Sequence, residues 1–151
     1  MSYCRLYYRV PFSETDAMGI VHHSNHARYM ERGRVELLRL AGLGYTQVIE
    51  RGYHFPLTDI SVSFKKPLVF DEVLIIETAL TEVSKIRLNF KYRIHKHEGL
   101  EVLPSEISAE ALAARPAVTG ETFHCAVNLQ GRPVPMEASL FEKLSSLRGS
   151  L

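Results

Sequence analysis

The stretch SETDAMGIVHHSNHARYMERGR, residues 13–34, joins a short polar turn to a segment with helical character. The turn holds one carboxylate, Asp16, three residues before Gly19. Three histidines follow it closely, namely His22, His23 and His26. The stretch therefore predicts a polar loop directly before a helix, with several chemically capable side chains close together.

A long helix is predicted from Ser24 or Asn25 to Ala41. Either first residue can act as the N-cap, because its side chain can accept from the free amides of the first turn. Apolar residues recur at helical spacing along this segment, and charged residues occupy much of the rest. Gly42 is expected to end the helix. Gly33, inside it, costs about 1 kcal/mol relative to alanine and would let another backbone approach closely.

Strands are predicted where apolar and polar side chains alternate. They cover residues 3–10, 60–65, 73–80, 86–95 and 122–129. The segment 73–80 is nearly all apolar, which indicates burial on both faces, and EVSK at 82–85 is expected to form a hairpin turn.

Two further segments have helical character. Residues 138–147 predict a C-terminal helix, and residues 105–115 predict either a short helix or a mobile excursion between strands. One long amphipathic helix against one antiparallel sheet is an α+β arrangement. A single helix leaves apolar sheet surface uncovered, so a partner subunit is expected.

Composition sets the broad class. The 151 residues suit one domain over 1–151, with 46% hydrophobic and 23% charged residues, as in ordinary globular proteins. The net charge of +1 gives no global field for nucleic acid or an anionic membrane. Two distant cysteines, Cys4 and Cys125, make a poor disulfide framework. With no signal pattern at the start and no membrane-length apolar run, a reduced cytoplasmic location is expected.

Asp16 lies just before the expected start of the helix, where unpaired amides and an effective charge of about +0.5 favour an anion. Such a helix end can stabilise the negative charge that develops on a carbonyl oxygen during acyl transfer. A carboxylate nearby can attack that carbonyl, or take a proton from the water that attacks it. The alternative is that Asp16 only caps its own turn, and local chemistry alone favours this alternative.

The histidines raise the question of a metal. His22 and His26 are four residues apart, so on a helix they would face the same way, as metal-binding pairs do. The metalloprotease pattern also needs a glutamate after the first histidine, and His23 stands there instead. His54 is the available third ligand, but its position forms no pattern with the pair. We therefore expect no metal, and a polar loop whose histidines bond to backbone.

Lys65 and Lys66 stand at the end of a predicted strand, just before Pro67. They can meet the phosphates of a nucleotide-bearing ligand as point charges. The alternative is a solvated strand end whose charge blocks aggregation. The sequence contains no glycine-rich phosphate loop, serine nucleophile elbow or Cys–His nucleophile pattern.

The stretch RVPFSETDAMGIVHHSNHARYMERGRVELLRLAG, residues 9–42, resembles the hotdog-fold acyl-CoA thioesterases. It is most similar to the 4-hydroxybenzoyl-CoA thioesterase group, which includes bacterial enzymes associated with the Tol–Pal system. That group has a Thr-Asp-x-x-Gly-x-Val turn, an asparagine at the helix entrance and a Glu-Arg-x-Arg segment on the helix. The matching residues here are Thr15, Asp16, Gly19, Val21, Asn25, Glu31, Arg32 and Arg34. Residues 62–78 and 120–136 resemble later strands of the same family.

The resemblance implies a hotdog fold, with one long central helix wrapped by a curved antiparallel sheet of about five strands. It also implies hydrolysis of an acyl-CoA to free acid and CoA, without a metal or organic cofactor. Asp16 matches the catalytic carboxylate, as general base or nucleophile, and the backbone amide of His23 matches the group that polarises the thioester carbonyl. The implied substrate-binding residues are Gly19, Val21, His22, Asn25, His26, Ser63, Phe64 and Lys65. Hotdog domains of this kind form dimers with sites at the interface, and the dimers often pair into tetramers, so a homotetramer is expected.

Departures from the family pattern leave alternatives open. Where His22 and His26 stand, the family often has an aromatic residue, which indicates a more polar acyl pocket here. Another thioesterase branch carries its carboxylate on the helix itself, where Glu31 and Glu36 are the candidates. A non-catalytic module that binds acyl-CoA or acyl-carrier protein is the alternative function, as is a hotdog hydratase or dehydratase.

Overall fold

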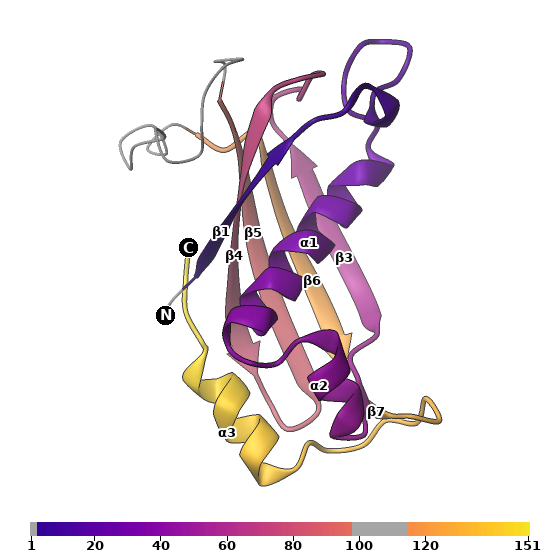
Figure 1. Cartoon of the computed structure of the whole chain (residues 1–151), viewed down its shortest axis with the longest axis vertical. Helices are drawn as coiled ribbons and strands as arrows, with labels where there is room; N and C mark the ends of the chain where they lie inside the picture. The colour runs from indigo at the N-terminus through magenta and orange to yellow at the C-terminus, as the bar shows by residue number, and fades with distance from the viewer. Residues whose placement is uncertain (1–2, 98–114) are drawn as a thin grey trace.

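Helix α1 (Ser24–Leu40) lies against one face of a five-stranded antiparallel sheet, as Figure 1 shows. The computed structural model describes residues 3–97 and 115–151. The helix ends one residue earlier than predicted, and Gly42 then adopts a left-handed φ of +73°. The predicted α+β fold is confirmed.

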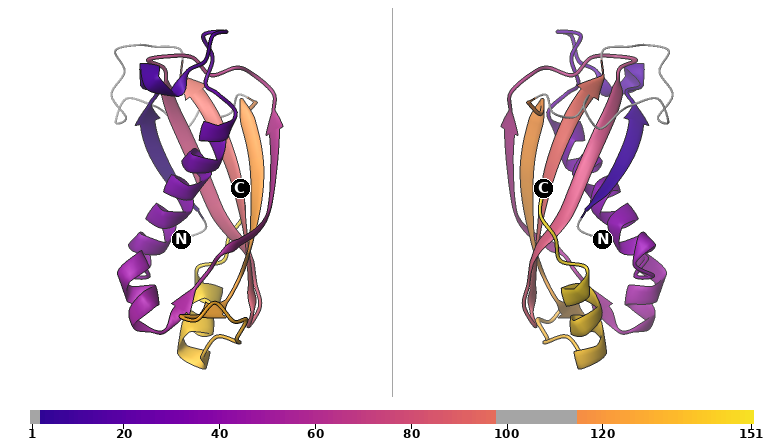
Figure 2. Two further views of the ribbon diagram at one scale, coloured as in Figure 1. Left: turned by 90° about the vertical axis from the view of Figure 1, so that its right-hand side faces the viewer. Right: turned by 90° about the vertical axis from the view of Figure 1, so that its left-hand side faces the viewer.

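The sheet has the strand order β1-β4-β5-β6-β3, with every neighbouring pair antiparallel. Its strands are β1 (Cys4–Arg9), β3 (Leu57–Phe64), β4 (Val73–Val83), β5 (Arg87–His97) and β6 (Val118–Cys125). The strands on either side of α1 in the chain, β1 and β3, form the two edges. Figure 2 turns the sheet to show α1 running along one side of it.

Two glycines allow α1 to lie close to the sheet. A Cβ added at Gly33 would stand 2.1 Å from Oγ1 of Thr78 on β4, and one added at Gly120 of β6 would stand 2.3 Å from Sδ of Met30. Met30 is completely buried between the helix and the sheet. The close neighbour expected at Gly33 is therefore a side chain of β4 and not a backbone.

Burial of the 73–80 segment on both faces is confirmed, because all eight residues are buried. On the sheet face away from α1, charged and polar side chains contribute to the burial of β4. Glu77 accepts from Arg5 Nε at 3.1 Å and lies 3.0 Å from Nε2 of His95. The predicted hairpin after β4 is also confirmed, since Ser84 N donates to Arg87 O at 2.9 Å.

The prediction of one strand over 122–129 is wrong. The chain leaves the sheet after β6, and Ala126 N donates to Ile86 O at 2.8 Å. Val127–Asn128 then forms a separate strand, β7, which pairs with β2 (Tyr53–His54). The short helix α2 (Tyr45–Glu50) and the 3-10 turn η1 (Phe12–Glu14) were not predicted. Helix α3 (Ala138–Ser146) confirms the predicted C-terminal helix.

Strand β3 is unusually open for an eight-residue strand. It pairs with β6 on one side and with no described strand on the other. Leu57, Ile60 and Phe64 are 46%, 43% and 55% exposed. The predicted element at 105–115 lies outside the described residues up to position 114. None of the described helices is long and apolar enough to cross a membrane, and Cys4 and Cys125 are both free thiols.

Candidate active site

The loop before α1 is a tight turn built around Asp16. Its amide donates to Ile20 O and its carbonyl accepts from Gly19 N, both at 2.9 Å. Gly19 has a φ of +76°, which an L side chain rarely adopts. Oδ1 of Asp16 accepts from Met18 N at 2.9 Å, while Oδ2 has no hydrogen-bond partner in residues 3–97 and 115–151. The turn-capping role is therefore real, and it leaves one carboxylate oxygen available.

Glu14 fastens this loop to the sheet and to the helix. Its carboxylate accepts from the hydroxyl of Tyr8 on β1 and from that of Tyr29 on α1, each at 2.8 Å. Its main-chain oxygen accepts from His22 N at 2.9 Å and from Nδ2 of Asn25 at 3.0 Å. Burial and the Glu14 carboxylate raise the pKa of both tyrosines, so both stay protonated donors. Sequence analysis missed Glu14, because its partners lie far along the chain.

The start of α1 leaves one main-chain amide unpaired. The N-cap is His23, and not Ser24 or Asn25 as predicted, because a local turn already forms at His22. Asn25 N donates to His22 O at 2.9 Å, and Ser24 N lies 3.3 Å from Nδ1 of His22. The amide of His23 donates to no residue in the described part of the chain. This amide is thus free to donate to a ligand at the positive end of the helix.

Asp16 and His23 line the same cleft, whose volume is about 390 Å³. It lies between the loop, the start of α1 and the segment that follows β3. The cleft is lined by Asp16, Met18, Ile20, Val21, His23, His26, Phe64, Lys65, Lys66, Pro67 and Leu68. Six of the sequence-predicted site residues therefore come together here. Lys66, which had been considered only with Lys65 as a phosphate contact, lies there too.

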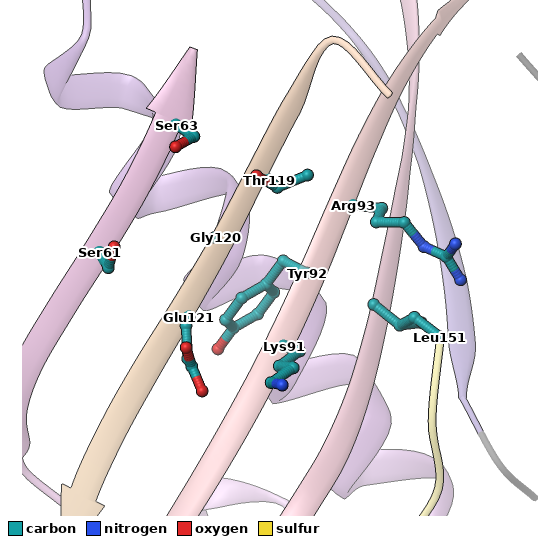
Figure 3. A pocket seen from close by; sticks show the side chains of 9 residues that line it. All are labelled: Ser61, Ser63, Lys91, Tyr92, Arg93, Thr119, Gly120, Glu121 and Leu151. Carbon is teal, nitrogen blue, oxygen red and sulfur yellow. The ribbon is translucent and has the colours of Figure 1, made fainter. Parts of the chain in front are cut away.

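Four predicted substrate-binding residues do not line this cleft. Gly19 shapes the turn, while His22 and Asn25 bond within the loop and the helix start. Ser63 faces the opposite side of the sheet, in a polar groove with Thr119 and Arg93 (Figure 3). Side chains alternate along a strand, so Ser63 points away from the face to which its neighbour Phe64 belongs.

His26 is the most enclosed polar side chain of the cleft. It is 4% exposed, and its ring meets those of Phe64 and Tyr29 at centroid distances of 4.9 and 5.7 Å. Burial, followed by the nearby His23, lowers the pKa of His26 to about 4. The imidazole is therefore neutral at neutral pH, and its Nδ1 is buried without a hydrogen-bond partner in the part of the chain that the structure describes.

The other candidate groups lie elsewhere. Glu31 pairs with Arg34 at 3.6 Å and lines a second cavity together with His54, and Glu36 pairs with Arg39. Neither glutamate lines the Asp16 cleft. In residues 3–97 and 115–151, no three His, Cys, Asp or Glu side chains are grouped so as to hold a metal.

Comparison with known proteins places the chain in a family. Residues 10–144 match the thioesterase-like superfamily. An Aquifex aeolicus protein named "Putative esterase" is 41% identical over 60% of this chain and 70% of its own length. The Bacillus subtilis "Putative acyl-CoA thioesterase YneP" is 32% identical over 76% of this chain and 78% of its own. The Escherichia coli acyl-CoA thioester hydrolase YbgC is 28% identical over 66% and 74%.

Solved structures agree with these matches. A hypothetical protein from Thermus thermophilus, 32% identical, superposes with a TM-score of 0.79 over 98% of this chain and 99% of its own. A 4-hydroxybenzoyl-CoA thioesterase, 19% identical, superposes with a TM-score of 0.76 over 95% and 99%, which shows the shared fold. The predicted resemblance and the prediction of a thioester hydrolase family are confirmed. This chain is a member of the thioesterase-like superfamily with the hotdog fold.

Proposed function

We propose that the chain hydrolyses acyl-CoA thioesters to a free acid and CoA in the cleft that Asp16 and His23 share. One observation carries the proposal. The same 390 Å³ cleft is lined by Asp16, which has an unused carboxylate oxygen, and by His23, whose amide at the helix end has no acceptor in the described part of the chain. These are the two groups that acyl transfer needs, a base or nucleophile and an oxyanion donor.

In the general-base route, Asp16 takes a proton from water as the water oxygen attacks the thioester carbonyl. The carbonyl oxygen becomes negative and accepts from the His23 amide, which the helix end favours. The carbon–sulfur bond then breaks, and the CoA thiolate receives the proton from Asp16. In the nucleophilic route, the Asp16 carboxylate attacks the carbonyl, the carbon–sulfur bond breaks, and CoA leaves as the thiolate. Water then hydrolyses the resulting anhydride, which releases the free acid and restores the Asp16 carboxylate, and the proton lost from water goes to the thiolate.

Lys65 and Lys66 are proposed to bind the phosphates of CoA. Both line the cleft and both are exposed at the end of β3, where a long ligand would leave it. As point charges at a solvated surface they would contribute mainly to substrate capture, and less so at high salt. The free thiols of Cys4 and Cys125 are consistent with the proposed cytoplasmic location.

The decisive experiment is Asp16→Asn. Asparagine keeps the Oδ1 acceptor for Met18 N, so the turn is expected to persist while the charge is lost. We expect kcat to fall by about a hundredfold or more, since removing a general base typically costs that much. Thiol release from a panel of acyl-CoA substrates measures it. Glu50→Gln, at the exposed end of α2 and outside the cleft, is the matched control and should keep wild-type activity.

A non-catalytic acyl-CoA binding module remains the competing function, and one observation favours it. Oδ1 of Asp16 is already engaged by Met18 N, as a purely structural aspartate would be. If wild type and Asp16→Asn bind CoA equally and neither releases thiol, the module is correct. Loss of activity in Glu31→Gln but not in Asp16→Asn would move the catalytic carboxylate to the helix.

A further inference from the structure

The imidazole of His26 has no hydrogen-bond partner among residues 3–97 and 115–151, although it is almost completely buried. It is 4% exposed, and Nδ1 is enclosed without a donor or acceptor nearby. Nε2 is not enclosed, and it makes no hydrogen bond to any residue in the described part of the chain. Buried polar atoms are almost always paired, and leaving one unpaired is costly. Nδ1 is closed off from a ligand, so Nε2, on a side chain that lines the cleft, is the nitrogen that a ligand can reach.

The surroundings of His26 decide which ring nitrogen carries the proton and can donate a hydrogen bond. A buried N–H without an acceptor is rarer than a buried lone pair, so the proton belongs on Nε2 and the lone pair on Nδ1. Burial keeps the pKa of the ring near 4, so the ring carries no charge at neutral pH. His26 thus offers one neutral N–H donor to whatever occupies the cleft.

The position of His26 limits where its ligand atom can lie. His26 is one helical turn beyond His23, and both line the same cleft with Asp16. In a cleft of about 390 Å³, an atom that touches His26 is only a few bonds away from a carbonyl at the His23 amide. The contact therefore falls on the acyl group close to the thioester, and not on the distant nucleotide end of CoA.

We infer that His26 selects acyl groups that carry a hydroxyl close to the thioester carbonyl. This inference rests on the proposed thioesterase function and names its substrate class. A hydroxyl oxygen can accept from Nε2–H, and the neutral ring meets a neutral group without burying an unpaired charge. Phe64, which lines the cleft and packs against the His26 ring, supplies apolar contact for the carbon skeleton.

The test compares substrates that differ by one hydroxyl. Butyryl-CoA is paired with 3-hydroxybutyryl-CoA, and benzoyl-CoA with 2-hydroxybenzoyl-CoA. We expect wild type to prefer the hydroxylated member of at least one pair by roughly tenfold or more in kcat/KM, the usual effect of one buried hydrogen bond. His26→Phe should reduce that preference to near one, chiefly by lowering kcat/KM for the hydroxylated substrate. His26→Gln, which keeps a neutral donor, should retain part of the preference.

Several outcomes would overturn the inference. Equal rates within both pairs for wild type would show that water or protein satisfies His26. An equal loss on both members in His26→Phe, with a lowered melting temperature, would show a structural role only. A preference for the hydroxylated member that His26→Phe leaves unchanged would assign the selection to another residue.

A binding measurement separates this inference from the proposed function. Dethia analogues, in which a methylene replaces the thioester sulfur, keep the carbonyl but cannot be hydrolysed. Calorimetry should show tighter binding of the hydroxylated analogue to wild type and equal binding of both analogues to His26→Phe. If wild type hydrolyses no thioester yet shows this difference, the proposed function fails and the role of His26 stands. If hydrolysis occurs and the difference is absent, only the role of His26 fails.

Discussion

At the scale of single residues, the molecule keeps two histidines neutral by burying them. His26 beside the cleft and His124 on β6 each have a pKa lowered to about 4, and burial is the main cause. His124 bonds to Phe55 O at 3.0 Å and to Oγ1 of Thr122 at 2.9 Å, whereas His26 bonds to nothing described. Neutral buried imidazoles make the folded state vulnerable to acid.

The sign of this pH dependence follows from the two pKa values. An unfolded histidine titrates near 6.5, so between pH 6.5 and about 4 the unfolded chain binds protons that the folded chain does not. The free energy of unfolding should therefore fall as pH drops through this window, by up to about 1.4 kcal/mol per pH unit for each imidazole. Below pH 4 the loss should level off.

Urea unfolding of wild type and His26→Gln at several pH values between 7 and 4 measures the contribution of His26. Glutamine does not titrate, so the variant should lose less stability than wild type between pH 6.5 and 4. Carboxylates elsewhere affect both proteins equally and cancel in the comparison. Parallel curves would show that His26 does not resist protonation.

At the scale of elements, the contact between α1 and β4 depends on the absence of a side chain at Gly33. Alanine would improve intrinsic helix stability by about 1 kcal/mol. Its Cβ, however, would stand 2.1 Å from Thr78 Oγ1 and 3.1 Å from Cγ2 of Ile76, distances that require the helix or the strand to shift. Overpacking of this kind typically costs about 1–3 kcal/mol, so the clash should dominate.

Gly33→Ala should therefore lower the free energy of unfolding by about 1–3 kcal/mol in urea titrations. The clashing atom is a hydroxyl oxygen that has no hydrogen-bond partner among the described residues. Thr78→Ala removes this atom, so the double variant should regain much of the stability lost in Gly33→Ala. Additive losses in the double variant would mean that another contact opposes the methyl group.

At the scale of the whole molecule, the unpaired edge of β3 is the surface best suited to contact with another protein chain. Long exposed edges with apolar side chains are normally protected, and Asp59 is the only charged residue on this strand. We propose that a second copy of the chain pairs along β3, and that such dimers pair again into the tetramer expected from the family resemblance.

Ile60→Lys tests this interface. In a two-fold interface each substitution occurs twice, so two like charges would face the contact and weaken it. Light scattering should give a dimer or a multiple of it for wild type, and a shift toward monomer for Ile60→Lys. Ile86→Lys, at the β4–β5 turn and 40% exposed, is the matched control and should keep the wild-type mass. A monomeric wild type would refute the proposed assembly.

The sequence predicted those parts whose structure is set by local pattern. The turn through Gly19, helix α1 and the strands up to β5 were foreseeable, because turn chemistry and hydrophobic period act over a few residues. The same alternation places Ser63 on the opposite face of β3 from Phe64, so these two residues cannot both line one cleft. Helix α2 is too short for a clear period, with only six residues.

Other parts depend on contacts that no local pattern contains. Strand β7 exists because β2, more than seventy residues earlier, pairs with it. Glu14 bonds to Tyr8 and Tyr29, and the isolation of His26 appears only when Phe64 packs beside it. The cleft itself combines two stretches that are far apart in the chain, residues 16–26 and residues 64–68.

Glu14 joins the edge strand, the loop and the helix in one place, and this has a mechanical consequence. Glu14 accepts hydrogen bonds from Tyr8, Tyr29 and Asn25. The loop that carries Asp16 and the helix start that carries His23 are therefore held rigidly together. If the cleft opens to admit a bulky ligand, the Asp16 carboxylate and the His23 amide move as one unit. The adjustment must then come from the opposite wall, where Lys65 and Lys66 follow the unsupported end of β3.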